Sequence, residues 1–268
     1  DWSSDVCSSD LIKVVSGQTE EVTDILADIY GSATTGGTYR ARNIKTAEAA
    51  KVIENAQRDI NIAFVNEATM IFQKLGISAY DVLETAGTKW NFLNFTPGLV
   101  GGHCIGVDPF YLAQRANEVG HFADLILTGL RINENMGKFI ADSVHENLNG
   151  KSKILVLGVT FKENVPDLRN TKVVDIIQVL RDHGHEVDVH DPLADKNEAQ
   201  QFLSIDLIES LSDLSGYNAI VGAVAHSVYR DLSPAALEEM MGGDGLIADV
   251  KGIWRDTEFS PQIKRWQL

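Results

Sequence analysis

The sequence predicts an α/β protein, and two observations carry that prediction. From Gly150 to the C-terminus, strand-like apolar runs alternate with helical patterns, which is typical of a parallel, doubly wound sheet. Before this region, a helical pattern without Gly or Pro extends from Thr46 to Leu75. The length of 268 residues leaves room for one large domain or two ordinary ones.

The composition excludes several classes of protein. The 23 Lys and Arg residues face 38 Asp and Glu, and the formal net charge of -15 argues against nucleic acid or an anionic membrane surface as a partner. Hydrophobic residues make up 44% of the chain, as in folded globular proteins. No apolar run reaches the roughly 18 residues of a spanning helix, and two cysteines cannot form a disulfide scaffold. We therefore expect a soluble, cytoplasmic protein.

Residues 1–11, DWSSDVCSSDL, differ from the rest of the chain. They have neither the features of a secretory signal nor a helical or strand periodicity. The string resembles the translation of a sequencing-library adapter. We expect residues 1–11 to be foreign to the protein and Cys7 to carry no function, with an ordinary disordered N-terminus as the alternative.

Residues 12–45 are expected to form the end of an α/β domain. Ile12–Ser16 is a short apolar run that predicts a strand. A helix is expected after Thr19, because apolar residues then recur at helical spacing: Val22, Ile25, Leu26 and Ile29. Gly31–Gly37 predicts a loop, and Thr38–Arg42 predicts a second strand.

Residues 46–149 are expected to be mostly helical. Thr46 predicts the N-cap of the long helix, which at 1.5 Å per residue would extend about 45 Å and link two domains. Helical spacing returns in SAYDVLETA, in PFYLAQRANEV and in one long run from LILTGLRINENMG to HENL. Asn91–Asp108 is the exception, with Gly and Pro but no periodicity.

Gly150 and Lys151 mark a boundary, and residues 150–268 are expected to form the last domain. KILVLGV, EVDVHD, YNAIVGAVAH and GLIADV predict strands, and TKVVDIIQVLRDHG predicts a helix with Gly184 at its C-cap.

The loop from Gly101 to Asp108 holds the strongest candidate for chemistry. Its glycines allow close approach of the backbone to a ligand, and they surround Cys104 with His103 beside it. A thiol in this setting suits covalent catalysis, although an inert buried cysteine is the more common case. A metal site is not predicted, because one Cys and one adjacent His lack the usual set of ligands.

Two further groups of polar residues are candidates for a functional site: one pair at helical spacing, and three cations that follow predicted strands. Lys51 and Asn55 lie four apart on one helix face, which by itself is more typical of a solvated surface. Lys162 and Arg169 follow the strand that ends at Gly158, and Lys251 follows GLIADV; a phosphate site at these strand ends is possible. The dinucleotide motif G-x-G-x-x-G does not occur in the chain.

Three segments together closely resemble the nucleotide-sugar dehydrogenase family: AEAAKVIENAQRDINIAFVNE, KWNFLNFTPGLVGGHCIGVDPFYLAQ and LGVTFKENVPDLRNTKVVDII. Within the family they look most like the UDP-N-acetylhexosamine 6-dehydrogenases of capsule and O-antigen pathways. The resemblance implies a remnant of a Rossmann NAD-binding domain over residues 12–45. An all-α dimerisation and catalytic domain would follow over residues 46–149, and a Rossmann-like UDP-sugar-binding domain over residues 150–268.

The resemblance also implies roles for individual residues. Such enzymes use NAD to oxidise the sugar C6 alcohol twice, and Cys104 matches the nucleophile that forms the thiohemiacetal and the thioester. Lys51 and Asn55 match the pair that stabilises the oxyanion, and Asp108 matches the residue that positions water. The expected substrate-binding residues are Gly101, Gly102, His103, Lys89, Lys162, Arg169 and Lys251.

One departure from the family pattern is that its glycine-rich NAD fingerprint has no counterpart in this sequence. We therefore expect the polypeptide as written to be an inactive fragment of a homodimeric enzyme. A non-catalytic module for UDP-sugar binding and dimerisation is the first alternative, and a Cys–His hydrolase is the second.

Overall fold

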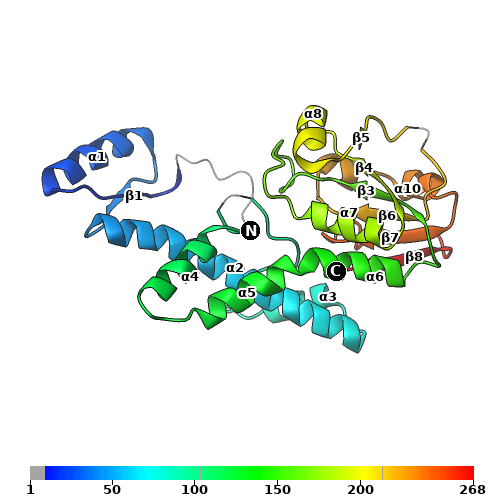
Figure 1. Cartoon of the computed structure of the whole chain (residues 1–268), viewed down its shortest axis with the longest axis horizontal. Helices are drawn as coiled ribbons and strands as arrows, with labels where there is room; N and C mark the ends of the chain where they lie inside the picture. The colour runs from blue at the N-terminus through cyan, green and yellow to red at the C-terminus, as the bar shows by residue number, and fades with distance from the viewer. Residues whose placement is uncertain (1–9, 103, 213) are drawn as a thin grey trace. The chain divides into compact units, whose positions relative to one another are not determined.

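The computed structural model describes residues 10–102, 104–212 and 214–268 of the chain (Figure 1). The chain divides into two compact units, Asp1–Arg58 and Asp59–Leu268, which are described separately. The predicted foreign segment falls almost entirely outside the described residues, as do Cys7 and His103.

The first unit contains a strand–helix–strand motif, as the sequence predicts. Strand β1 (Lys13–Val15) pairs in parallel with β2 (Thr38–Arg40), and helix α1 (Glu20–Ala33) connects them. Thr19 is the N-cap, since its hydroxyl accepts the Val22 N–H at 3.2 Å. The loop predicted from Gly31 is wrong at its start, because α1 continues to Ala33 before the chain turns.

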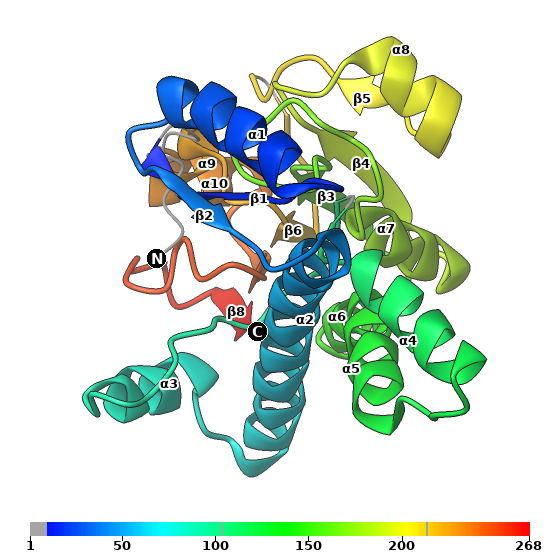
Figure 2. The same cartoon turned by 90° about the vertical axis from the view of Figure 1, so that its left-hand side faces the viewer.

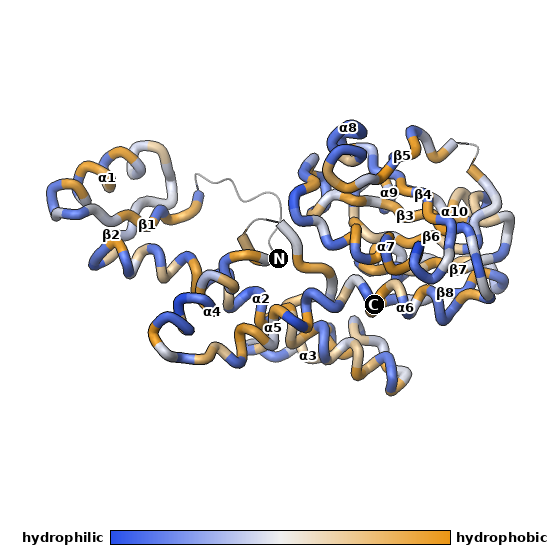
Figure 3. Tube along the Cα trace, viewed as in Figure 1, coloured by the Kyte–Doolittle hydropathy of each residue, from blue (hydrophilic) through white to orange (hydrophobic). Residues whose placement is uncertain are grey.

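Helix α1 leaves most of its apolar stripe exposed. Val22, Ile25 and Ile29 are all exposed, although their spacing is that of a core-facing helix. The hydropathy trace in Figure 3 shows this mixture of polar and apolar positions along α1.

The long helix is confirmed as α2 (Ile44–Leu75), which belongs to both units (Figure 2). Its predicted N-cap at Thr46 is wrong. The Asn43 side chain accepts the backbone N–H of Thr46 at 2.8 Å, so the cap lies three residues before the predicted one and the helix begins at Ile44.

Four shorter helices follow in the second unit: α3 (Ala79–Gly87), α4 (Asp108–Glu118), α5 (Asp124–Glu134) and α6 (Met136–Glu146). The long helical run predicted from LILTGL onward is therefore broken into two. The break lies at Asn135, whose side-chain amide donates to the Arg131 carbonyl at 2.8 Å and competes with the helical ladder.

The predicted parallel sheet is confirmed, with the strand order β5-β4-β3-β6-β7-β8. Its strands are β3 (Lys153–Leu157), β4 (Glu186–His190), β5 (Leu207–Ile208), β6 (Ala219–Gly222), β7 (Gly245–Asp249) and β8 (Ile263–Gln267). The chain moves outward from β3 to β5 and then returns to β6. The junction between β3 and β6 is therefore the topological switch point, where ligands bind in such sheets.

The helix predicted after β3 is α7 (Val173–Asp182), with Gly184 at φ +85 directly after its cap. The sequence did not predict β5, β8 or four short helical segments: α8 (Lys196–Glu198), the π-helical turn Ala199–Leu203, α9 (Ser227–Arg230) and α10 (Pro234–Met240).

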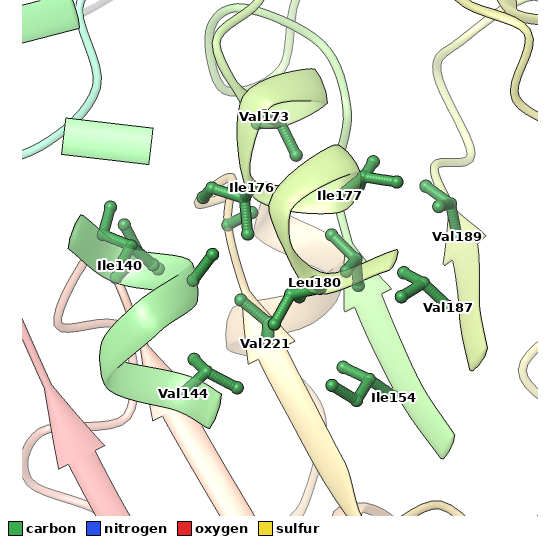
Figure 4. Packing of buried hydrophobic residues seen from close by; sticks show 14 of the residues in the cluster. Ile140, Val144, Ile154, Val173, Ile176, Ile177, Leu180, Val187, Val189 and Val221 are labelled. Carbon is green, nitrogen blue, oxygen red and sulfur yellow. The ribbon is translucent and has the colours of Figure 1, made fainter. Parts of the chain in front are cut away.

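The core of the second unit joins its helical part to its sheet. Ile140 and Val144 of α6 pack with Ile176 and Leu180 of α7 over the strands (Figure 4). The two helices approach closely at Gly137, where an added Cβ would lie 2.7 Å from the Asp175 Cβ. This packing holds the loop before α4 and the end of β3 in one compact unit.

Candidate functional site

Cys104 is exposed in the turn that precedes α4. Its carbonyl accepts the N–H of Asp108 at 2.9 Å and that of Val107 at 3.2 Å, so the first turn of α4 fixes the backbone of the cysteine. Asp108 is the first residue of this helix, one turn after the thiol. The structure thus places the predicted nucleophile and the predicted water-positioning carboxylate in a single tight turn.

Gly101 and Gly102 bring this turn against a second loop, residues 158–171. A Cβ at Gly101 would lie 2.7 Å from the Asn170 carbonyl oxygen, and one at Gly102 would lie 3.0 Å from the Phe161 ring. The Asn170 amide also donates to the Gly102 carbonyl at 3.0 Å. The two glycines are therefore required by contact between the loops, before any ligand is considered.

A pocket lies beside this contact, at the carboxyl end of β3. Gly101, Phe161, Lys162, Glu163, Lys172 and Lys251 are among the residues that line it. We call it the lysine pocket. Three lysines and one glutamate line the pocket, which reaches the start of α7, and the Lys172 ammonium pairs with Asp175 in the first turn of that helix at 3.7 Å. The pocket thus joins two of the predicted cations, Lys162 and Lys251, and its cavity of about 20 Å³ has room for one water-sized group.

Lys251 is held in a desolvated position. Burial lowers its pKa, and the negative charge of Glu163 opposes that effect. Gly98 makes room for it, because a Cβ at that position would lie 3.2 Å from the Lys251 Nζ. A buried ammonium of this kind gains most from a bound anion.

Two other predicted cations do not line the lysine pocket. The Arg169 guanidinium is exposed and forms a two-pronged pair with the Asp167 carboxylate, at 2.9 Å and 2.6 Å. Lys89 lies after α3 and lines a shallow depression with Asp81 and Thr85.

Lys51 and Asn55 lie together on α2 in the first unit, with the Lys51 Nζ 3.5 Å from the Asn55 Oδ1. Lys51 also pairs with Glu54 at 3.2 Å. The spacing alone favoured a solvated helix face for both residues. That expectation is wrong for Asn55, which has only 1% of its surface exposed.

Sequence reasoning missed a buried polar chain that supports the Cys104 loop. The Asn66 amide donates to the Gly98 carbonyl and accepts the Gly98 N–H, at 3.0 Å and 2.8 Å. Asn66 also donates to Asn133 of α5, which donates to the Asp59 carboxylate at 2.7 Å. Burial raises the pKa of Asp59 to about 6. The available signal was Asp59 and Asn66, seven residues apart on one face of α2.

Sequence reasoning also missed Asp191 and His226, which follow β4 and β6. Both are buried and hydrogen-bonded to the loop that carries Lys162. The signal that could have found them is that Asp191 directly follows β4 and His226 ends the apolar run that contains β6.

The residues of the first unit do not fit the pyrophosphate of NAD. Such a site needs several glycines between a strand and a helix whose first turn attracts phosphate. The turn between β1 and α1 has a single glycine, Gly17, and the first turn of α1 carries Glu20 and Glu21. These carboxylates would repel the pyrophosphate.

The described residues offer neither a membrane span nor a cluster of metal ligands. Within residues 10–102, 104–212 and 214–268, no helix combines the length and the apolar character needed to span a bilayer. The same part of the chain has no group of three or more His, Cys, Asp or Glu residues arranged to hold a metal ion.

Comparison with known proteins gives consistent matches over most of the chain. Residues 45–135 match the central domain of the UDP-glucose/GDP-mannose dehydrogenase family, and residues 155–256 match its UDP-binding domain. Protein CapL of Staphylococcus aureus is 50% identical over 96% of this chain and 62% of its own length. A UDP-N-acetyl-D-glucosamine 6-dehydrogenase of Pseudomonas aeruginosa is 42% identical over 91% of this chain and 59% of its own.

The fold is also shared with a solved structure. The UDP-N-acetyl-mannosamine dehydrogenase Cap5O of S. aureus superposes with a TM-score of 0.80 at 27% identity, over 97% of this chain and 60% of that one. The chain spans about 60% of the length of the relatives it matches.

Proposed function

This chain belongs to the UDP-glucose/GDP-mannose dehydrogenase family, and we propose that it supplies the UDP-binding and covalent parts of a UDP-N-acetylhexosamine 6-dehydrogenase. The observation that carries the proposal is the lysine pocket beside the Cys104 turn. Gly101, which lines the pocket, is three residues before the exposed Cys104 and packs against Asn170 of the loop that carries Lys162. A UDP-sugar has a diphosphate for the lysines of the pocket and a reactive sugar carbon for the thiol.

The lysines at the pocket are proposed to contact the diphosphate of the substrate, which is too large to be enclosed by a cavity of about 20 Å³. Lys162 and Lys251 offer positive charge, Lys172 is shared with Asp175 at 3.7 Å, and the desolvated state of Lys251 strengthens its attraction for phosphate oxygens. The names of two relatives favour UDP-N-acetylglucosamine as the sugar nucleotide, and UDP-N-acetylgalactosamine is the second substrate that we propose. Arg169 and Lys89 are also proposed to contact the substrate, although neither of them lines the lysine pocket.

Cys104 is proposed to act as the nucleophile on the C6 aldehyde. Its thiolate adds to the carbonyl carbon, a C–S bond forms, and the carbonyl oxygen becomes an oxyanion. The proposed partners of that oxyanion are the Lys51 ammonium and the Asn55 amide. At the later thioester, water adds to the carbonyl carbon and the C–S bond breaks, which returns the thiolate and releases the acid. Asp108 is proposed to orient that water.

NAD, the hydride acceptor of this family, is proposed for the whole protein. No oxidation step is assigned to residues of this chain. We further propose the domain limits 12–45, 46–149 and 150–268, and a role in the synthesis of surface polysaccharide, which the capsule-type name of CapL supports.

We also propose a cytoplasmic homodimer. Large apolar side chains are exposed along α4 and α5: Phe110, Tyr111, Val119, Phe122 and Leu125. An apolar surface of this kind is typical of a subunit interface. The exposed free thiol of Cys104 suits a reducing compartment.

A non-catalytic module that binds UDP-sugars is the second candidate, and the misfit of the first unit to NAD favours it. One experiment separates the two. The chain is incubated with UDP-N-acetylglucosamine 6-aldehyde, and the adduct is measured by native mass spectrometry. The enzyme assignment predicts a covalent adduct at Cys104 that Cys104→Ser lacks while it still binds UDP. Binding of UDP without any covalent adduct would leave the module as the better description.

A further inference from the structure

We propose that His226 and Asp191 are positioning residues for UDP binding, which fix the backbone on both sides of Lys162 and thereby pre-form the lysine pocket. The inference rests on the proposed function, because it takes the lysines of that pocket as contacts of the diphosphate. Neither residue lines the pocket, so each would act through Lys162.

The Asp191 carboxylate is saturated with hydrogen bonds that order two loops. Its Oδ2 accepts the N–H groups of Val159 at 2.7 Å and Thr160 at 3.0 Å, at the start of the loop that carries Lys162. Its Oδ1 accepts those of Leu193 at 2.9 Å and Ala194 at 3.2 Å. A fully buried carboxylate with this many donors has a single favourable geometry.

His226 is held in one tautomer by its neighbours. The backbone N–H of Asn164 can only donate, and it lies 2.9 Å from the His226 Nδ1. In the neutral ring the proton is therefore on Nε2, which lies 3.1 Å from the Asp191 Oδ2 and 3.0 Å from the Thr160 Oγ1. His226 thus connects the residues before and after Lys162.

Thr160 closes the network on Lys162 itself, because its hydroxyl donates to the Lys162 carbonyl at 3.2 Å. Asn164 has the left-handed φ of 57, and its side chain receives the Ser227 N–H at 3.0 Å. The loop is therefore held at residues 159, 160, 162 and 164.

We call the hydrogen-bonded network of Asp191, His226 and Thr160 the clamp. Its residues follow three neighbouring strands at the carboxyl edge of the sheet. Val159 follows β3, Asp191 follows β4 and His226 follows β6. The backbones meet closely here, since a Cβ at Gly158 would lie 2.4 Å from the Val224 Cβ. A loop ordered in advance does not lose its conformational freedom on binding, so the clamp increases affinity for the anion.

The test is calorimetric titration of UDP into the full chain and its variants. His226→Ala is expected to weaken UDP binding at least tenfold. The matched control is His190→Ala, since His190 is also buried and hydrogen-bonded, to Tyr229 at 2.9 Å, but its side chain bonds to no part of the loop among the interactions described. Its expected effect on UDP binding is less than twofold. His226→Gln, which can both accept from Asn164 and donate to Asp191, is expected to restore most of the affinity.

A double-mutant cycle separates positioning from general destabilisation. If His226 acts through Lys162, Lys162→Ala costs much less affinity in the His226→Ala background than in the parent chain. Additive losses, or UDP binding by His226→Ala within twofold of the parent, would overturn the inference alone. Absence of UDP binding by the parent chain would instead overturn the proposed function. If His226→Ala does not fold, UDP binding is measured for Thr160→Val instead. The inference predicts UDP binding at least threefold weaker than that of the parent chain, and unchanged binding would overturn it.

Discussion

The buried carboxyl of Asp59 gives the sharpest prediction about stability. It has 0% of its surface exposed, and its Oδ2 has no hydrogen-bond partner within the described part of the chain. Burial, with a further contribution from the charge of Glu134, raises its pKa from 3.8 to about 6, against the opposing hydrogen bond from Asn133. A shift of about 2 pKa units corresponds to about 3 kcal/mol.

The sign follows from proton binding. The folded state holds this proton at pH values where the unfolded state has lost it, so the free energy of unfolding falls as the pH rises through the window from about 4 to about 6. Asp59→Asn keeps the shape of the side chain but cannot ionise. Relative to the parent, the variant should therefore gain about 2 kcal/mol of stability between pH 4 and pH 7.

The assay is urea unfolding, followed by circular dichroism at a series of pH values, for the parent chain and the variant. Asp206→Asn makes the same chemical change at an exposed position and is the matched control. A difference between Asp59→Asn and the parent that is constant from pH 4 to pH 7 would refute the reasoning.

Three further perturbations test the sheet and its core. Burial alone would raise the pKa of Asp191, but the hydrogen bonds from His226 and from the Val159 and Thr160 amides lower it to about 2. Asp191→Asn should therefore cost about 2 kcal/mol at pH 7, a cost that shrinks as the pH falls from about 4 to about 2 in the same urea assay; a cost that does not depend on pH would contradict this. Gly222→Ala places a Cβ 2.6 Å from the Trp254 ring and should cost about 1–3 kcal/mol, whereas Gly31→Ala, with its nearest atom at 3.9 Å in a helix, should not destabilise the chain. Leu180→Ala empties a fully buried site between α6, α7 and the sheet and should cost roughly 2–5 kcal/mol in thermal or urea unfolding; a loss below 1 kcal/mol would show that this core is not formed as described.

Periodicity predicted the regular elements of this chain well. The 3.6-residue pattern of α2 and the apolar runs of β3, β4 and β7 are strong because burial selects them residue by residue. It failed at short or local features. The N-cap at Asn43 and the break at Asn135 depend on single side-chain hydrogen bonds, and β8, with the pattern IKRWQ, has no apolar run to mark it.

The candidate site was predictable only in part, for a similar reason. Cys104 and Asp108 are close in sequence, so their proximity in one turn follows from the chain itself. Lys162, after β3, and Lys251, after β7, line one pocket only because β3 and β7 flank β6 in the sheet, an order that the chain reaches by returning from β5 to β6. The buried polar groups that hold the two loops, among them Asn66, are invisible to hydropathy, because a satisfied polar side chain in a core carries no apolar signal.

The most direct test of the central claim is affinity labelling of Cys104. A UDP-linked bromoacetyl compound is compared with free bromoacetamide, and the modified peptides are quantified by mass spectrometry with Cys7 as the internal reference thiol. If the lysine pocket binds UDP beside the thiol, the UDP-linked reagent should alkylate Cys104 far faster than the free reagent, and excess UDP or Lys162→Ala should abolish that advantage. Equal rates for the two reagents at Cys104, or rates that UDP does not change, would contradict the account.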